Sequence, residues 1–484
     1  MDQNKISSLW ELSSSGRRAV RVPASDVPKA ELDEKLARKV EPELPEVSEL
    51  DLIRHYTRLS TLNYSIDTRF YPLGSCTMKY NPRLNEQTAR MAGFAASHPY
   101  APESLVQGNL ELLYELQNGL SELAGFKATS LQPAAGAHGE LAGVLMIKKY
   151  HVSRGDKGRT RFLIPDSAHG TNPASVAMGG FEAVELPSDG RGNIDLSKLK
   201  ELCDESIAGI MITNPNTLGL FEEQIIEVIE TVHACGGLVY GDGANLNAIM
   251  GVVKPGELGF DVMHYNLHKT FSTPHGGGGP GAGPVGAADS LKDFLPGPIV
   301  VVSEDDPDSY TLAKPEKSIG RLKGFNGNFG VLVRAYTYFL SLGGNGLRDA
   351  SESAVLGANY LMSKVKDILP PWYDRICMHE FVSSGQNLAE GVHTMDLAKR
   401  LIDYGFHPPT VYFPLIVPEA LMVEPTETES LEILDAFADT LRIIVKESQE
   451  NPQLLHDAPH REMVSRLDEV MAVKKPVLRD ILRL

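Results

Sequence analysis

Between about residue 104 and residue 266, short apolar segments alternate with amphipathic ones, and this alternation constrains the fold more than any other feature of the sequence. The apolar segment Ile207–Thr213 predicts a buried strand, and the amphipathic segment Glu222–Ala234 predicts a helix that is closed by two glycines. Further strands are predicted at Arg161–Pro165, Ala183–Leu186, Leu238–Gly241 and Val262–Asn266, and further helices at residues 110–123 and at Leu196–Cys203. Such alternation predicts an α/β fold in which βαβ units surround a mainly parallel sheet.

The segments on either side of this region are patterned differently. Residues 1–103 are interrupted by prolines and are weakly periodic, which predicts an extended N-terminal arm with short helices. Residues 104–330 are expected to form the large domain, and a long helix is predicted from about Asn328 to Leu342, closed by Gly343 and Gly344. A smaller C-terminal α/β domain is expected over residues 331–484, with strands near His379–Ser383, Thr410–Leu415 and Leu421–Glu424 and helices near Thr394–Tyr404 and Glu427–Lys446.

Charge and cysteine content narrow the classes of function. Asp and Glu number 63 against 46 Lys and Arg, a formal net charge of -17, which disfavours nucleic acids and anionic membranes as partners. The four cysteines form no CxxC pair, and their spacing fits neither a zinc site nor a disulfide framework, so we predict no metal and a reducing compartment. No apolar run is long enough to span a bilayer, and the N-terminus has no secretory signal, so we expect a cytoplasmic protein.

A His-Lys pair at residues 268 and 269 follows the predicted strand Val262–Asn266. Sites in open α/β sheets lie at the carboxyl ends of the strands. A partly desolvated lysine in that position can act as an amine nucleophile toward an aldehyde. For a lysine considered alone, an exposed position in a loop is the commoner case.

Two other segments favour the reactive lysine over an exposed one. Asp242 ends an apolar strand, and a buried acid there needs a cationic or hydrogen-bonded partner, such as a protonated pyridine nitrogen. Small residues in Gln132–Glu140 lead into a helix and would let backbone N–H groups approach an anion. Each has a plainer alternative: an Asp that caps a turn between two glycines, and a simple helix cap. The order of small-residue turn, strand-end Asp and strand-end Lys is nevertheless the order used by fold type I enzymes that bind pyridoxal phosphate.

Four longer motifs narrow this class of enzymes to one family. They are Tyr71–Lys79, Asp166–Ser175, Asp242–Ala248 and the pair His268–Lys269, which is followed by the glycine run Gly276–Gly279. Together they resemble the glycine decarboxylases, or P-proteins, of the glycine cleavage system, from about Ser14 to Pro425. The chain is about half as long as the single-chain members and is similar to their C-terminal, lysine-bearing half, which split systems call subunit 2. The resemblance implies a fold type I transferase dependent on pyridoxal 5′-phosphate, with a mainly parallel sheet of the seven-stranded type and a smaller C-terminal α/β domain.

The resemblance also assigns roles to individual residues. Lys269 would attach the cofactor, Asp242 would pair with its pyridine nitrogen, and His169 would stack on its ring. The other implied contacts are backbone donors to the phosphate at Ala135, Gly136 and Ala137, a phosphate or substrate contact at His268, a contact to the ring hydroxyl at Asn214, and substrate contacts at Ser75, Cys76, Thr77 and Lys79. A helix-capping role for His169 and a plain Asn-Pro turn at Asn214 remain alternatives.

The implied activity is the decarboxylation of glycine, with transfer of the aminomethyl group to the lipoyl arm of a carrier H-protein. The implied partners are that lipoylated H-protein and a homologous, lysine-free P-protein subunit 1, with two copies of each subunit. An aminotransferase or a simple amino-acid decarboxylase of the same fold is the alternative, since fold does not fix function. A scaffold subunit without catalysis is disfavoured because it needs neither Lys269 nor Asp242. A nicotinamide-dependent dehydrogenase is also disfavoured, because the GxGxxG match at residues 281–286 follows no strand and contains prolines.

Overall fold

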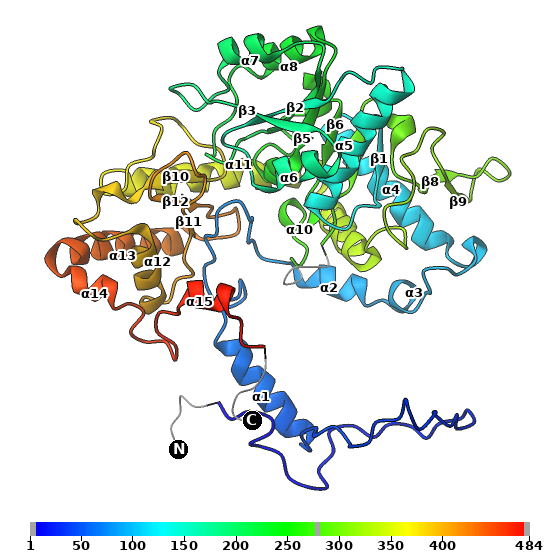
Figure 1. The fold of residues 1–484 in the computed structure, drawn as a ribbon, viewed down its shortest axis with the longest axis vertical. Helices are drawn as coiled ribbons and strands as arrows, with labels where there is room; N and C mark the ends of the chain where they lie inside the picture. The colour runs from blue at the N-terminus through cyan, green and yellow to red at the C-terminus, as the bar shows by residue number, and fades with distance from the viewer. Residues whose placement is uncertain (1–5, 276–280, 479–484) are drawn as a thin grey trace. The chain divides into compact units, whose positions relative to one another are not determined.

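The computed structural model describes residues 6–275 and 281–478, and the chain divides into two units after Arg69 (Figure 1). The described part of the first unit, residues 6–69, is irregular except for helix α1 (Glu49–Thr61), which begins where the Ser48 hydroxyl accepts a hydrogen bond from the Asp51 N–H. None of the residues of α1 is buried. Residues 70–103 belong to the second unit, together with the sheets described below. The expected domain boundaries at residues 103 and 330 stay predictions.

The second unit is built around a seven-stranded sheet with the strand order β1-β7-β6-β5-β4-β2-β3. Strands β2 to β6 pair in parallel, whereas β7 is antiparallel to both β6 and β1. The strands are β1 (Ala128–Ser130), β2 (Arg161–Pro165), β3 (Glu182–Leu186), β4 (Ile207–Thr213), β5 (Leu238–Asp242), β6 (Val262–His264) and β7 (Val285–Ala287). The predicted mainly parallel α/β sheet is therefore confirmed, and β2 and β4 have the bounds that the sequence predicts.

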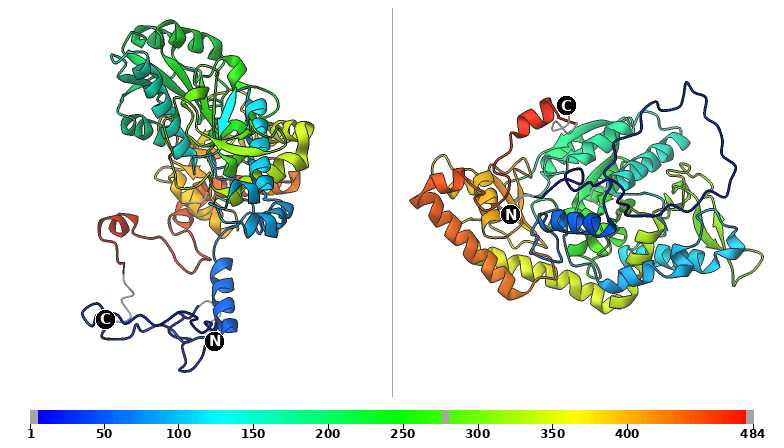
Figure 2. Two further views of the ribbon diagram at one scale, coloured as in Figure 1. Left: turned by 90° about the vertical axis from the view of Figure 1, so that its right-hand side faces the viewer. Right: turned by 90° about the horizontal axis from the view of Figure 1, so that it is seen from below.

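Helices cover both faces of this sheet (Figure 1 and Figure 2). Residues of β4 enter two different hydrophobic clusters: Ile210 and Ile212 pack with α4 and α8, and Ala208 and Met211 pack with α5 and α6. Because helices cover both faces of the sheet, all seven residues of β4 are buried, and only Thr213 among them has a polar side chain. The helices of these two layers are α4 (Gln107–Ala124), α5 (Gly136–Ser153), α6 (Thr171–Met178), α7 (Leu196–Leu202) and α8 (Ile225–Ala234).

Helix α11 (Phe329–Val365) leads from the large sheet to the C-terminal part of the unit. The sequence predicts that this helix ends at Leu342, but the structure continues it by more than twenty residues. Gly343 has a φ of +60°, which a glycine adopts without steric cost, so the helix kinks there and resumes. Residues on both sides of the kink are buried, which explains why packing continues the helix beyond the two glycines.

The C-terminal part contains an antiparallel sheet with the order β10-β12-β11. Its elements are β10 (Phe381–Ser384), α12 (Thr394–Asp403), β11 (Thr410–Val411), β12 (Ala420–Val423), α13 (Leu431–Glu450), α14 (Pro452–His456) and α15 (Glu469–Lys474). One hydrophobic cluster joins the sheet to α12, α13 and the second half of α11. The predicted smaller C-terminal α/β region is thus confirmed as an architecture.

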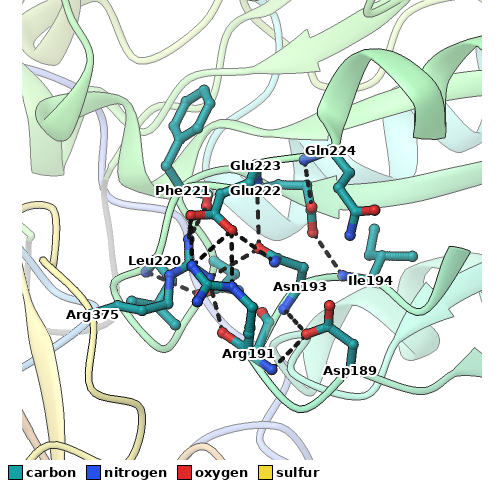
Figure 3. A network of polar contacts seen from close by, with 12 residues as sticks. Asp189, Arg191, Asn193, Ile194, Leu220, Phe221, Glu222, Glu223, Gln224 and Arg375 are labelled. Carbon is teal, nitrogen blue, oxygen red and sulfur yellow. Dashed lines mark hydrogen bonds and ion pairs between the residues drawn. The ribbon is translucent and has the colours of Figure 1, made fainter.

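Arg375 connects the segment before β10 to loops of the large sheet (Figure 3). Its guanidinium donates hydrogen bonds to the carbonyl oxygens of Arg191 and Phe221 and to Asn193 Oδ1, at 2.9–3.0 Å. It also lies 3.3 Å from a carboxylate oxygen of Glu223. Four acceptors for one buried guanidinium hold these loops in one arrangement relative to β10.

Candidate active site

A cavity of about 250 Å³ lies where several strands of the large sheet end. Strand β5 supplies Asp242, β6 supplies His264, and the short helix α10 (Leu267–Thr270) that follows β6 supplies Lys269. The predicted site residues that line the cavity are Ser75, Ala135, Gly136, Ala137, His169, Asp242, His268 and Lys269. Cys76, Thr77, Lys79 and Asn214 are not among its lining residues, and their placement is described below.

Asp242 is buried and held by three donors. Asn172 Nδ2 lies 3.0 Å from Oδ2, the Ala244 N–H lies 2.9 Å from Oδ1, and His264 Nε2 lies 3.4 Å from Oδ1. Burial alone would raise the pKa of Asp242, but these three neighbours outweigh burial and hold the pKa below its ordinary value. Asp242 is therefore a carboxylate that a cationic partner in the cavity can pair with.

His264 orients that carboxylate, and the sequence analysis did not single it out. Its Nδ1 lies 2.7 Å from the Tyr240 hydroxyl, and its Nε2 lies 2.7 Å from Asn266 Oδ1. An amide oxygen only accepts hydrogen bonds, so Nε2 carries a hydrogen. The available signal was position, because His264 ends the strand beside the one that ends in Asp242.

The amino end of α5 forms another part of the cavity wall, through Ala135, Gly136 and Ala137. The first N–H groups of a helix have no intrahelical acceptor and favour an anion such as a phosphate. Asn266 approaches Gly136 so closely that a Cβ there would lie 2.4 Å from Asn266 Nδ2, so a larger residue would require Asn266 to move. Glycine at position 136 therefore leaves room for the Asn266 side chain.

His268 and His169 contribute two imidazoles to the wall. Nδ1 of His268 is buried without a hydrogen-bond partner among the described residues, so it remains available to a bound group. Burial, with smaller contributions from His275 and Lys269, lowers the pKa of His268 to about 3, so this ring is neutral. His169 follows β2, and its Nδ1 lies 2.9 Å from the Thr171 hydroxyl.

The Lys269 amine donates a hydrogen bond to the carbonyl oxygen of Ser75 at 2.8 Å. Within residues 6–275 and 281–478 this is the only hydrogen bond of the amine, and no carboxylate pairs with it. The amine is therefore not held in an ion pair, as a lysine that reacts with an aldehyde requires. The sequence motif thus brings a lysine, a buried aspartate and a helix amino end to one cavity.

The four predicted site residues outside the cavity lining are buried or bound to other side chains and backbone groups. Cys76 is largely buried, and burial raises the pKa of its thiol to about 11. Thr77 binds Glu424, and the Lys79 amine donates to Glu427, Asn247 and Tyr338. Asn214 is buried, and its Oδ1 accepts from the Glu222 N–H at 3.1 Å. Contacts of these side chains with cofactor or substrate stay predictions, and the glycine run at 276–279 lies outside the described residues.

The lining residues fit pyridoxal 5′-phosphate. The carboxylate of Asp242 suits a pyridinium nitrogen, the amino end of α5 suits a phosphate, and the Lys269 amine, bound only to a backbone carbonyl among the described residues, suits an aldehyde. The unpartnered Nδ1 of His268 is an orphaned polar atom of the kind that a bound group satisfies.

Comparison with known proteins places the chain in a family. A model of the glycine cleavage system P-protein matches residues 21–389, and a model of the glycine dehydrogenase C-terminal domain matches residues 350–463. The chain belongs to the glycine cleavage system P-protein family. It is 57% identical over 473 residues to a probable glycine dehydrogenase (decarboxylating) subunit 2 of Thermotoga maritima, covering 97% of this chain and 99% of that one. It is 56% identical over 476 residues to the protein of the same name from Caldanaerobacter subterraneus, with coverage of 97% and 98%.

Solved structures support the same architecture. A crystal structure of a glycine decarboxylase (P-protein) in inhibitor-bound form matches with a TM-score of 0.72, at 22% identity, over 85% of this chain and 92% of that one. A glutamate decarboxylase of Lactobacillus brevis matches with a TM-score of 0.65 at 15% identity, over 88% and 96% of the two chains. The resemblance drawn from the P-protein motifs is confirmed, and with it the fold type I architecture and the pyridoxal 5′-phosphate cofactor.

Proposed function

We propose that this P-protein is the lysine-bearing subunit of a glycine decarboxylase, with its catalytic centre in the cavity around Lys269. The observation that carries this proposal is the meeting of Lys269, Asp242 and the amino end of α5 in one cavity, in a chain 57% identical to a glycine dehydrogenase subunit 2. Residues 104–330 would form the cofactor-binding domain and residues 331–484 the smaller domain. We expect the protein to act in the cytoplasm; in the described part of the chain, no helix has the length and apolar character that crossing a membrane requires.

Each residue of the cavity has a defined task in this mechanism. Bound there, pyridoxal phosphate would supply an electron sink for the electron pair released when carbon dioxide leaves glycine. Asp242, kept ionised by Asn172, Ala244 and His264, would hold a proton at the pyridine nitrogen. The α5 amino end would bind the phosphate, and the Lys269 amine would hold the aldehyde carbon and move protons beside it.

The substrate glycine would lie between His169 and the Ser75 turn, which both line the cavity. Polar donors at the cavity wall would hold the glycine carboxylate in one orientation for the loss of carbon dioxide. Ser75 offers a hydroxyl at the cavity wall, whereas Thr77 and Lys79 already bind Glu424 and Glu427. Ser75 is therefore our first candidate for a substrate contact, with Cys76, Thr77 and Lys79 behind it.

The test of the catalytic assignment is reduction of the cofactor-loaded protein with borohydride, followed by peptide mapping. We expect the label on Lys269, and a label on any other lysine would contradict the assignment. Addition of glycine should change the visible spectrum more than addition of other amino acids. An equal response to a longer amino acid would favour the alternative, an aminotransferase or another amino-acid decarboxylase.

The relatives are named subunit 2, which supports a second, homologous subunit as partner. We expect that partner to lack the lysine, with two copies of each subunit, and we expect a lipoylated H-protein to accept the aminomethyl group. Within the described part of the first unit, residues 6–69, apolar side chains such as Val22 and Leu36 are 87% and 78% exposed. An obligate interface buries roughly 2,000 Å² or more of largely apolar surface, so the N-terminal arm, expected over residues 1–103, is our candidate for the contact.

The partner proposal is tested by exchange of labelled bicarbonate into glycine in the presence of H-protein. The assay is run with this chain alone and after adding the candidate subunit 1. Exchange that requires both chains is the expected result. Full activity of this chain alone would contradict the two-subunit assignment while leaving the Lys269 assignment intact.

A further inference from the structure

The turn at residues 74–77 carries the carbonyl group that binds Lys269, and its backbone is in a rare conformation. Ser75 has a φ of +63° and Thr77 a φ of +47°, in the left-handed region that residues other than glycine adopt only when their surroundings hold them there. Gly74 before them has no room for a side chain, because a Cβ would lie 2.2 Å from Met422 Cγ. A turn of this kind needs specific contacts to persist.

Two carboxylates from the C-terminal part of the chain supply those contacts. Glu380 Oε2 accepts a hydrogen bond from the Ser75 N–H at 2.6 Å, and Glu424 Oε2 accepts one from the Thr77 N–H at 2.9 Å. The Thr77 hydroxyl also donates to Glu424 Oε1. Glu380 directly precedes β10 and Glu424 directly follows β12, where Phe381 pairs with Val423. The antiparallel pairing therefore places the two acids side by side under the turn.

These acids are unusual because they are fully buried and no lysine or arginine among the described residues pairs with them. Glu380, Glu424 and the adjacent His379 are each 0% exposed. His379 Nε2 lies 3.8 Å from an oxygen of each acid, which is too long for a hydrogen bond, and both of its ring nitrogens are unpartnered among the described residues. A buried carboxyl group without a cation is costly, so a site that keeps two of them needs a reason beyond packing.

The groups that face this pair define its charge state. Lys269, Cys76, His379 and Glu427 face it from the neighbouring segments. Burial, together with repulsion by Glu424, raises the pKa of Glu380 well above its ordinary value. Burial also raises the pKa of Glu424 to about 7, against the hydrogen bonds from Thr77. The pair therefore keeps a proton near neutrality and offers its remaining oxygens to the turn.

Glu380 also reaches the loop that follows Asp242. Asn245 Nδ2 lies 3.4 Å from Glu380 Oε1 and donates to the Pro215 carbonyl at 2.9 Å. Asn245 lies three residues after Asp242 in the chain. One carboxyl group thus contacts both the turn that binds Lys269 and the segment that carries the aspartate.

We propose that Glu380 and Glu424 are positioning residues of the active site, which clamp the turn at residues 74–77 so that the Ser75 carbonyl fixes the Lys269 amine. This inference rests on the proposed function only in that Lys269 attaches the cofactor. The clamp makes the small C-terminal sheet a structural part of the site, although it contributes no residue to the cavity wall.

The test uses the cofactor-loaded protein and the variants Glu380→Ala, Glu424→Ala, Glu380→Gln and Glu424→Gln. The readouts are the visible circular dichroism of the bound cofactor, the rate of cofactor release on dilution, and the melting temperature. We expect both alanine variants to release cofactor about tenfold faster or more and to lose much of the visible ellipticity, because the turn loses its acceptors. The glutamine variants keep an acceptor oxygen and should retain most of both signals.

Asp403 provides a matched control. It is a buried carboxylate that accepts backbone N–H groups of His460 at 2.6 Å and of Arg461 at 2.9 Å and also pairs with Arg400 at 2.9 Å, at the end of α12 and outside the cavity wall. Asp403→Ala should lower the melting temperature but leave the release rate and the ellipticity unchanged. Alanine variants of Glu380 and Glu424 that behave like Asp403→Ala would overturn the positioning role.

A milder variant keeps the test decisive if the alanine variants do not fold. Thr77→Val removes the hydroxyl that donates to Glu424 and keeps the backbone N–H. We expect roughly threefold faster cofactor release, and a release rate and ellipticity equal to wild type would overturn the clamp. Borohydride labelling of the wild type at Lys269 distinguishes failure of the clamp from failure of the proposed function. If the wild type is labelled and every variant behaves like it, only the clamp fails; if the wild type is not labelled at Lys269, the proposed function fails first.

Discussion

Lys269 and Lys79 are two lysines of the same structural unit with opposite surroundings. The Lys79 amine is buried and donates to Glu427 at 2.7 Å, to Asn247 at 2.8 Å and to the Tyr338 hydroxyl at 3.1 Å. The Lys269 amine lines a cavity and, among the described residues, donates only to a backbone carbonyl. Both lysines occur in motifs that resemble the P-protein family, so the motifs alone do not separate their roles.

The difference shows that the partner, more than burial, decides what a lysine can do. Burial alone would lower the pKa of Lys79, but Glu427 and Tyr338 outweigh burial and raise it, so this amine stays protonated and has no lone pair to offer. Lys269 has no such carboxylate partner in the described structure, which suits the nucleophilic role that we propose for it. Lys79, by contrast, joins its own segment to Glu427 and Tyr338.

The largest expected effect comes from removing the reactive amine. Lys269→Ala should lower the rate of glycine–bicarbonate exchange by about 10³-fold or more, because it removes both the attachment point and the proton carrier. Borohydride should then label no lysine, and the melting temperature of the cofactor-free protein should stay near that of the wild type. Residual labelling at Lys79 in this variant would show that the two lysines can exchange roles, which contradicts the comparison.

The second effect concerns the paired lysine. Lys79→Met should cost about 3–5 kcal/mol of unfolding free energy, because Glu427 is then left buried without its cation. Denaturant unfolding measures this cost, and borohydride labelling at Lys269 should persist in the folded protein. The double variant Lys79→Met with Glu427→Gln removes both charges and should recover much of the loss. A double variant as unstable as the single one would show that packing, not the ion pair, explains the cost.

The third effect tests the acids instead of the lysines. Glu427 has a lysine partner, whereas no lysine or arginine among the described residues pairs with Glu424, and burial raises the pKa of Glu424 to about 7 from 4.5. Because its pKa is higher in the folded than in the unfolded protein, Glu424 binds its proton more tightly in the folded state. The contribution of this proton to stability is complete below pH 4.5 and is lost as the pH rises through 7.

Glu424→Gln cannot ionise and so lacks this loss. The unfolding free energy of the wild type should therefore fall relative to that of Glu424→Gln by up to about 3 kcal/mol between pH 4.5 and 7. Taking the difference removes the opposite trend of His379, whose pKa is lowered to about 3 by burial and whose contribution is lost as the pH falls. A difference that stays constant with pH would show that Glu424 is ionised throughout, as a paired acid is.

The sequence predicted the parts of the site that depend on local pattern. Strand β4 was predicted with its observed bounds because the mainly apolar run of residues 207–213 is followed by a turn, and Asp242 and Lys269 were singled out because they lie at or just after the ends of strands. The turn at residues 74–77 was placed beside the substrate, but its supports were missed. Ser75 and Glu380 are separated by 305 residues, and Thr77 and Glu424 by 347, so no periodicity connects them.

The errors have the same origin. The helix predicted to end at Leu342 continues because residues beyond the kink at Gly343 are buried by tertiary packing, which a local glycine signal does not report. Lys79 was grouped with Ser75 and Thr77 because it lies in the same motif, yet its amine binds Glu427 from a distant segment. Which side chain a lysine meets depends on the assembled fold, and only the structure shows it.

The smallest expected effect comes from a second lysine–glutamate ion pair, which has the same N–O distance as Lys79–Glu427 but lies in solvent. Lys254 Nζ lies 2.7 Å from a Glu122 oxygen, as Lys79 Nζ does from Glu427, but the Lys254 and Glu122 side chains are 38% and 82% exposed. Water solvates both charges in the folded and in the unfolded protein, and salt screens their attraction, so the pair contributes little to stability. Lys254→Met should leave the melting temperature unchanged within experimental error at physiological ionic strength, and the variant and the wild type should still melt together at high salt. A loss comparable to that of Lys79→Met would show that distance, and not burial of the partner, sets the cost of removing a lysine.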